Sequence, residues 1–429
     1  MSVDDHLLSI LTFGDVLSSL ILSSWRTPLG GGKVTGGLQA QARMLFKGAL
    51  AIFVVTIVIG ILNGLDIWDP SRTMLLTHVH AGTLGWITLA VVACTMAMFG
   101  DDADQKSVAS GRNLSMAALV TVVIYVVAFA TTTGIFRPIA GTLLLVSIVW
   151  LLIWVGGRYR ASEKTTAQLA LYLAVVSLTI GAILGVLLGL FVANGSLPGL
   201  STERAAALAG AHPAAMLIGY LILAGVGVSH WVLNGGQGIV GRLVAWALFV
   251  AGLIVNVAFI FDLVDELAPV FSGLQVIAII AYIVHMWSRI KPSAWAGGGA
   301  ANFGRVAVLG LVVGIGLLVY VVQLFTSGQL DPETGTGPVG VLIAFDHAMF
   351  IGVMTNALFA AIGRLASTPA ATNRLVLLAV NTGVLLFLIG LISESAILKR
   401  IGTPIMGLAL LWAIATYWQG LGQSQPATA

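Results

Sequence analysis

The sequence has very little charge and almost no cysteine, and both shortages limit what the protein can be. Only 9% of its 429 residues are charged, against roughly 25% in an ordinary globular protein, and 58% are hydrophobic. So few charges cannot cover the surface of a water-soluble chain of this length. The single cysteine, Cys94, excludes an internal disulfide framework and a metal site built from several cysteines. A net charge of only +3 gives no basis for binding nucleic acid.

The N-terminal region also lacks the marks of a removable signal peptide, which are a basic stretch and a small-residue cleavage site. Residues 7–25 are apolar at helical spacing but contain Asp15 and several serines. This pattern favours a helix that lies on the membrane surface, with a thirteenth span as the alternative. We expect residues 1–44 to form an N-terminal cytoplasmic or interfacial segment, 45–421 a membrane domain, and 422–429 a C-terminal tail.

Twelve long apolar segments make up the predicted membrane domain. A transmembrane helix needs about 20 apolar residues, and each segment is long enough. The sequence therefore predicts an all-α integral membrane fold of twelve transmembrane helices. Approximately, the segments cover residues 45–65, 78–100, 114–134, 137–156, 167–193, 205–233, 240–262, 267–289, 304–327, 338–363, 374–393 and 401–421.

The distribution of Lys and Arg predicts how these helices are oriented. If the N-terminus is inside, fifteen of the 20 Lys and Arg residues fall on the inner side. Such an excess is typical of the cytoplasmic face, so we expect both termini in the cytoplasm. The chain is then a multi-pass protein of a bacterial-type cell (plasma) membrane, with membrane lipid as a partner. The five outer basic residues are Arg72, Arg137, Arg204, Lys399 and Arg400.

Four of the seven histidines share one setting, near the outer ends of the second, sixth and tenth segments. Ionisable or coordinating groups inside a membrane segment are costly, so they are functional candidates by default. These four are His78, His80, His212 and His347. The other three are His6, in the N-terminal segment, and His230 and His285, near inner helix ends, where a helix–helix hydrogen bond or an interfacial role is the more ordinary explanation.

The spacing of the four histidines indicates an internal repeat. The distance from His78 to His212 is 134 residues, and that from His80 to His347 is 267, close to twice as many. A glycine follows both members of the first pair after seven residues, and both members of the second begin the pattern His-Ala-x-x-x-Gly. We therefore expect three pseudo-symmetric four-helix units, in which the second, sixth and tenth helices are equivalent.

Helix geometry predicts how these histidines can be used. Residues i and i+2 lie about 200° apart around a helix, so His78 and His80 point to opposite sides. They cannot easily bind one small metal ion, but each can reach a different cofactor, with His212 and His347 as partners. A haem held between imidazoles from two helices matches this supply of ligands. We expect one or two haem b groups; which of His78 and His80 faces the tenth helix stays open.

Short motifs around these residues resemble the catalytic subunit of the heme–copper oxidase superfamily, which includes cytochrome c oxidase subunit I and the nitric oxide reductases. The stretches are THVHAGTLGW in the second segment, AHPAAMLIGYLILAGVGVSHW in the sixth and FDHAMFIGVMTNALFAAIG in the tenth. The resemblance implies twelve helices in three arcs, His212 at the copper-ligand position and His347 at the low-spin haem position. It also implies that Lys399 and Arg400, in LKRIGTP, lie over the haem propionates.

The chain also departs from the family pattern. The position of the high-spin haem ligand holds Phe345, the seventh segment has no histidine, and Met216 replaces the redox-active tyrosine. Acidic residues lie at helix ends, as in Asp262 and Asp346, rather than at mid-membrane. The resemblance therefore implies a divergent member without the usual copper site. Copper stays an alternative at His212, beside Phe345.

The predicted function is that of a membrane b-type cytochrome on an oxidase-like scaffold. It would transfer electrons, or bind and reduce a small gas such as nitric oxide or oxygen, as a haem-dependent oxidoreductase with a cytochrome or quinol as electron donor. Two alternatives remain open. One is a small-molecule transporter without haem, which needs a mid-membrane polar pathway, for which Asn256, Asn356 and Asn381 are the main candidates. The other is a non-catalytic subunit that has kept the oxidase fold.

Overall fold

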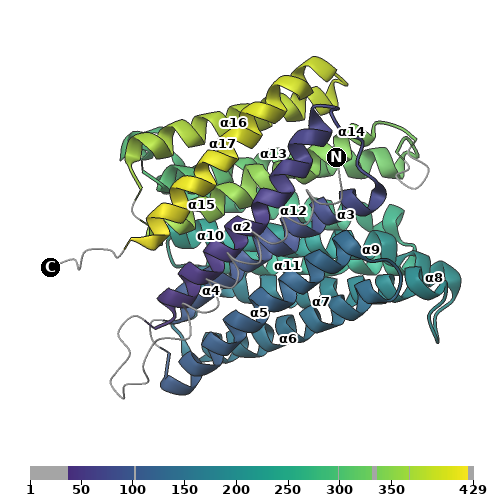
Figure 1. Ribbon diagram of the computed structural model, residues 1–429, viewed down its shortest axis with the longest axis horizontal. Coiled ribbons are helices and arrows are strands. Elements are labelled where there is room, and N and C mark those ends of the chain that lie inside the picture. The colour runs from purple at the N-terminus through teal and green to yellow at the C-terminus, as the bar shows by residue number, and fades with distance from the viewer. Residues whose placement is uncertain (1–36, 101–102, 298, 331–335, 367, 424–429) are drawn as a thin grey trace, which may run out of the picture.

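The structure is a computed structural model that describes residues 37–100, 103–297, 299–330, 336–366 and 368–423 (Figure 1). Within these ranges it contains twelve helical spans that are long and apolar enough to cross a membrane. The prediction of an all-α, multi-pass membrane protein is therefore confirmed. The predicted surface helix at 7–25, His6 and most of the predicted C-terminal tail lie outside the described residues.

Nine spans are single helices and three are interrupted. The single helices are α2 (Gln39–Gly64), α5 (Gln105–Thr131), α6 (Phe136–Ala161), α7 (Thr166–Asn194), α11 (Ile239–Phe261), α12 (Val264–Ile290), α13 (Ala301–Thr326), α16 (Ala370–Ile392) and α17 (Ala396–Gly422). The interrupted spans are the second, with α3 (Arg72–His80), η1 (Ala81–Thr88) and α4 (Leu89–Gly100); the sixth, with α8 (Thr202–Ala206), α9 (Leu208–Ala214), η2 (Ala215–Leu221) and α10 (Ile222–Val232); and the tenth, with α14 (Val339–His347), η4 (Ala348–Thr355) and α15 (Asn356–Leu365). A short 3₁₀ helix, η3 (Pro292–Gly297), follows α12.

The first span begins at Gln39, six residues earlier than its apolar stretch predicts. This extra turn contains Arg43 and is followed by Lys47, whose charges can stay near the surface on long side chains. Arg43 Nη1 donates to the backbone oxygen of Gln423 at 2.9 Å, and Lys47 Nζ lies 5.6 Å from the ring centre of Trp418. These contacts bring the two ends of the membrane domain to the same end of the bundle.

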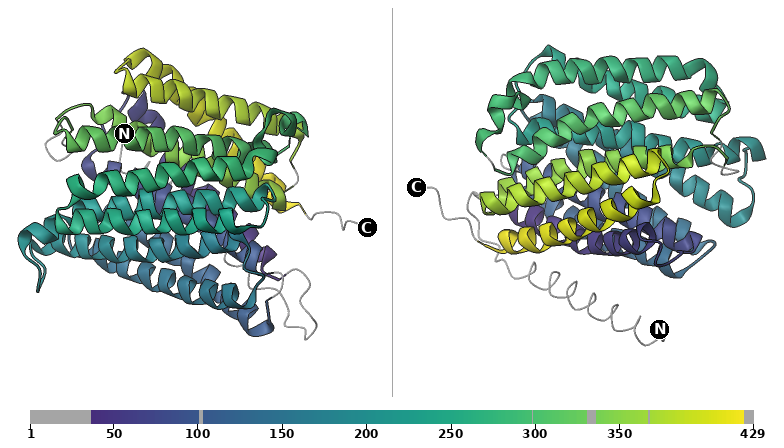
Figure 2. Two further views of the ribbon diagram at one scale, coloured as in Figure 1. Left: turned by 180° about the vertical axis from the view of Figure 1, so that it is seen from behind. Right: turned by 90° about the horizontal axis from the view of Figure 1, so that it is seen from above.

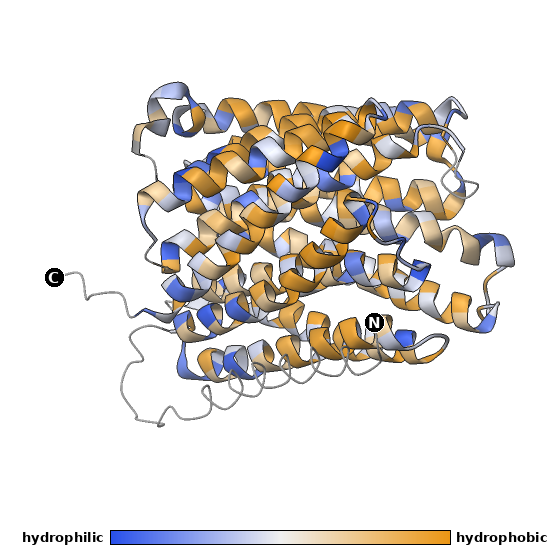
Figure 3. Ribbon diagram, turned by 45° about the horizontal axis from the view of Figure 1, so that its top comes forward, coloured by the Kyte–Doolittle hydropathy of each residue, from blue (hydrophilic) through white to orange (hydrophobic). Residues whose placement is uncertain are grey.

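The helices run side by side along the bundle, with apolar residues over their lengths and polar residues gathered at their ends (Figures 2 and 3). The second, sixth and tenth spans lie in the centre. Their most apolar windows are 83%, 89% and 67% buried, whereas no other span exceeds 56%. The remaining nine spans surround them and expose apolar faces, as a lipid-facing ring should.

The three central spans share one irregularity, a π-helical segment of about two turns. The segments begin at Ala81, Ala215 and Ala348, so the second and third starts lie 134 and 267 residues after the first. These are the same offsets that relate the histidines in the sequence. A π segment inserts one residue into the i→i−4 pattern and is frequent at functional sites. The irregularity therefore occurs at equivalent positions on all three central helices.

Buried hydrogen bonds join the π segments at the middle of the bundle. Trp86 Nε1, on η1, donates to Thr355 Oγ1, on η4, at 3.0 Å. Tyr220 OH, on η2, donates to Thr88 Oγ1, on η1, at 3.2 Å. The hydroxyls of Thr88 and Thr355 each donate to the backbone carbonyl oxygen five residues earlier in their own helix. The π-helical geometry leaves these carbonyl groups accessible. The three central helices are thus held at one level by polar contacts in an apolar core.

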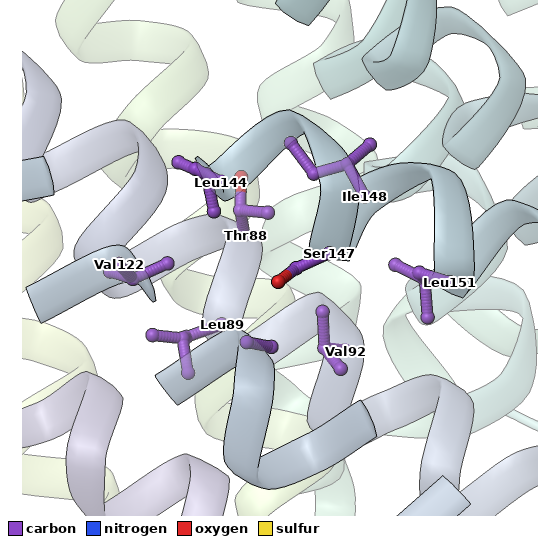
Figure 4. A pocket seen from close by; sticks show the side chains of 9 residues that line it. Thr88, Leu89, Val92, Val122, Leu144, Ser147, Ile148 and Leu151 are labelled. Carbon is purple, nitrogen blue, oxygen red and sulfur yellow. The ribbon is translucent and has the colours of Figure 1, made fainter. Parts of the chain in front are cut away.

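A small pocket opens between η1, α4, α5 and α6 (Figure 4). Its lining is aliphatic except for Thr88 and Ser147, and both hydroxyls have hydrogen-bond partners. No ionisable side chain lines it. The chemistry-bearing residues of the fold lie elsewhere.

Candidate histidine sites

All four candidate histidines lie near one end of the bundle, opposite the end where Gln39 and Gly422 meet. They follow the starts of the second, sixth and tenth spans by six to ten residues, which is a rise of about 9–15 Å along a helix. Each immediately precedes or lies close to the start of a π segment. All four are half-buried among the helices.

Two of the histidines are anchored to the neighbouring helix in the same way. His78 Nδ1 lies 2.9 Å from the carbonyl oxygen of Thr56 on α2, and His212 Nδ1 lies 2.8 Å from that of Gly181 on α7. Each ring also packs on the glycine one turn further along that helix. A methyl group at Gly60 would lie 3.0 Å from Cε1 of His78, and one at Gly185 would lie 2.7 Å from Cε1 of His212. Only glycine lets the rings come this close.

The other two histidines are anchored to their own helix. His80 Nδ1 lies 2.7 Å from the carbonyl oxygen of Leu76, and His347 Nδ1 lies 2.8 Å from that of Ile343. In both cases the acceptor is four residues earlier, on α3 and α14. These two residues again occupy equivalent positions in the repeat, since 267 residues separate them.

The anchoring has a consequence for the chemistry of each ring. A carbonyl oxygen can only accept, so each Nδ1 carries the proton and donates it. The other ring nitrogen, Nε2, then bears the lone pair, and among the described residues no hydrogen-bond partner is found for it at any of the four positions. A metal-binding histidine is usually held in this way, with one nitrogen donating to a carbonyl and the other free to coordinate.

The structure divides the four residues into two pairs. His78 lies close enough to His347 for the two rings to interact electrostatically, and His80 stands in the same relation to His212. The sequence left open which of His78 and His80 faces the tenth span, and this proximity favours His78. Each pair combines a ring anchored to a neighbouring helix with a ring anchored to its own helix. We call them the 78–347 pair and the 80–212 pair.

Aromatic side chains enclose both pairs. The ring of His80 lies 4.1 Å from the ring of Phe129 and 5.5 Å from that of Tyr125, both on α5. The ring of His347 lies 4.9 Å from that of Phe387 on α16. The position of Tyr125 beside His80 could not be predicted from the sequence, because the third span contains no histidine and no recognised motif.

Lys399 and Arg400 lie in the first turns of α17, where they share one carboxylate. Lys399 Nζ is 3.2 Å from Oδ1 of Asp66, and Arg400 Nε is 3.0 Å from Oδ2. Asp66 follows the end of α2, six residues after Gly60, the glycine under His78, so this cluster lies beyond the His78 ring at the same end of the bundle. The hydrogen bonds from Lys399 and then from Arg400 hold the pKa of the Asp66 carboxyl below its ordinary value. No sequence motif indicates a role for Asp66. The packing of α17 against α2 brings it to Lys399 and Arg400.

His230 and His285 lie at the opposite end of the bundle. Their rings stack, with centres 5.5 Å apart and planes within 5°. His285 Nε2 donates to the carbonyl oxygen of Gly236 at 3.1 Å. The two residues form a helix–helix contact, which agrees with the ordinary explanation for membrane histidines.

In the described part of the chain, no three His, Cys, Asp or Glu side chains come together in a group that could hold a metal ion. The potential ligands are therefore the two histidine pairs. Neither the protein-family models nor the curated proteins contain a match to this chain.

Proposed function

We propose that this chain is a membrane b-type cytochrome that binds two haems, one at the 78–347 pair and one at the 80–212 pair. The observation that carries the proposal is the common anchoring of the four imidazoles. Each is held by its Nδ1 proton, and each keeps Nε2 for a ligand. Haem iron takes four nitrogens from the porphyrin and needs only one or two axial ligands from the protein, so two histidines are enough.

The donor set fits haem better than a mononuclear ion. A zinc or copper site is ordinarily built from three or four protein ligands. Each pair here offers two, and Cys94, the only cysteine of the chain, is buried apart from them in α4. A covalently attached c-type haem needs two cysteines before a histidine, which the sequence lacks. The haem is therefore bound through its axial ligands and its surroundings. Copper at His212 remains an outcome of metal analysis.

The proposal includes an oxidase-like scaffold of three pseudo-symmetric units. Equivalent π segments on the three central spans support this arrangement, as does the repetition of both anchoring modes. In such a repeat, positions 78, 212 and 345 are equivalent, and so are positions 80, 214 and 347. Each histidine pair joins a position of the first kind on one central helix to a position of the second kind on another. The third meeting of this kind, between the tenth and sixth spans, would bring together Phe345 and Ala214, which cannot bind metal. Two haems are therefore the full complement.

With two low-spin sites and no third ligand set, electron transfer is the chemistry that these residues support best. A gas such as nitric oxide or oxygen could react only where an axial histidine leaves the iron. The electron donor would be a cytochrome or a quinol at the plasma membrane of a bacterial-type cell, with both termini in the cytoplasm.

Two of the three mid-membrane asparagines, Asn356 and Asn381, give the transporter alternative no support. Asn356 and Asn381 donate to each other's side-chain oxygens at 2.9 and 3.1 Å, and Asn356 also donates to carbonyls of η4. They complete the backbone of a π segment and do not line a polar pathway. A transporter needs such a pathway near the membrane midplane.

An absorption spectrum of the purified protein tests the proposal. We expect sharp α bands after dithionite reduction, about two haems b per chain by pyridine hemochrome, and little copper or zinc by metal analysis. A colourless protein, obtained from cells that supply haem to a control cytochrome, would refute the proposal and favour the transporter.

The ion cluster at Asp66 should tune the potential of the 78–347 site. Positive charge near iron disfavours the oxidised state, so Lys399→Gln with Arg400→Gln should lower one midpoint potential in a redox titration. Asp66→Asn should raise the same potential. Protonation of Asp66 acts in the same direction, and because its pKa is lowered by Lys399 and Arg400, this rise should begin only at a pH below the one at which an ordinary aspartate is protonated. If neither variant moves either midpoint while haem content is intact, the cluster is an ordinary membrane anchor.

A further inference from the structure

Arg137 lies at the outer end of the bundle, beside the 80–212 pair. It is the second residue of α6, and its Nη2 donates to the carbonyl oxygen of Phe129 at 2.9 Å and to Oγ1 of Thr73 at 3.3 Å. Its guanidinium carbon lies 4.9 Å from the centre of the Phe129 ring, which in turn packs against His80. The guanidinium is close enough to His80 and to Tyr125 to interact with both electrostatically.

The hydrogen bonding of this arginine is incomplete. A guanidinium has five N–H donors, and the contacts within the described residues come only from Nη2. Nε is buried and has no partner among those residues. No carboxylate of the described chain lies within salt-bridge distance of Arg137, whereas Lys399 and Arg400 share Asp66. A partly buried charge with unused donors is costly unless an anion accompanies it.

The position of Arg137 indicates which anion this is. It stands at the outer edge of the 80–212 pair, much as Lys399 and Arg400 stand beyond the 78–347 pair. The planar guanidinium suits a carboxylate, to which it can donate two parallel, charge-assisted hydrogen bonds. A haem b has two such groups, its propionates, at one edge of the ring. A lipid phosphate offers similar acceptor chemistry and is the competing source.

We propose that Arg137 binds a propionate of the haem held by His80 and His212, and so sets the affinity and potential of that site alone. The inference rests on the proposed function. It is specific to one of the two sites, because Arg137 contacts α3 and α5 on the His80 side of the second span. The other pair lies on the opposite side of that helix, against α2 and α16.

Redox titration of the full-length holoprotein, with haem-to-protein ratios, tests the inference. His212→Ala and His347→Ala first assign the two components of the titration to the two sites. Arg137→Gln should then lower the midpoint of the component lost in His212→Ala and leave the other unchanged. A tenfold change in the ratio of affinities for oxidised and reduced haem corresponds to about 59 mV for a one-electron couple. Arg137→Lys, which keeps the charge, should recover most of this shift.

The matched control is Arg204→Gln. Arg204 is also an arginine over a phenylalanine ring, 5.8 Å from the centre of Phe261, and no contact between it and either pair is found among the described residues. It should leave both components unchanged. The assignment is overturned if Arg137→Gln moves neither midpoint at full haem content, or moves both equally, as loss of a bound lipid or of surface charge would. A wild-type protein without haem refutes the proposed function itself and the Arg137 assignment with it.

Discussion

Replacing His347 with alanine should lower the haem content from about two to about one per chain and remove one low-spin signal. His347 supplies Nε2 from α14, and His80, the histidine nearest to His78 in the chain, packs against α5 and not against α2 where His78 is anchored. A haem held by one imidazole in place of two binds more weakly, so we expect it to be lost during purification. Pyridine hemochrome assays and low-temperature EPR of the purified variant measure both results.

His285→Ala is the control for this experiment. His285 is also a membrane-helix histidine, but it stacks on His230 at the opposite end of the bundle. It should keep both haems, so a general loss of haem through misfolding would show in both variants. A His347→Ala protein that inserts normally and keeps the full wild-type spectrum would remove this residue from the site.

Double replacement should separate the two pairs. His78→Ala with His347→Ala affects two ligands of one site, so it should retain about one haem, like either single variant. His80→Ala with His347→Ala affects one ligand of each site and should lose nearly all haem. The same number of imidazoles is removed in both proteins, so the comparison depends on the pairing alone.

The opposite result would reverse the assignment of partners. If the His78→Ala, His347→Ala protein loses nearly all its haem and the His80→Ala, His347→Ala protein keeps about one haem per chain, then His80 faces the tenth span. Equal loss in both double variants would indicate a single shared site. Optical spectra of membranes, normalised to protein content by immunoblot, are sufficient to distinguish these results.

Much of the fold is readable from the sequence because a membrane imposes length and polarity on each helix. Each of the twelve spans overlaps the apolar segment that predicts it, although four begin five to nine residues earlier, and the spacing of the histidines predicts the register of the π segments. The π segments themselves are not predictable. They depend on how three helices meet in the core, where Trp86 and Tyr220 bind partners on other spans.

The sequence could not identify the groups that support the histidines. Thr56 and Gly181, which hold His78 and His212, lie 125 residues apart, although the histidines lie 134 apart. α7 continues five residues further beyond Gly181 than α2 does beyond Thr56, and the sixth span begins four residues further before its histidine than the second span does, so a fixed offset misses the equivalence. Asp66 and Arg137 lie at helix ends, and only the packing of distant helices shows what they approach.

The four histidines lie at similar depth near one face of the bundle, and this has a consequence for how the protein would respond to membrane voltage. An electron that passes between the 78–347 and 80–212 sites moves parallel to the membrane plane. Moving a charge across the whole membrane costs or releases about 2.3 kcal/mol per 100 mV, but a sideways step does almost no electrical work. The distribution of one electron between the two centres should therefore be the same in energised and de-energised membranes. Only its arrival from, or departure to, the other side would be sensitive to the membrane potential.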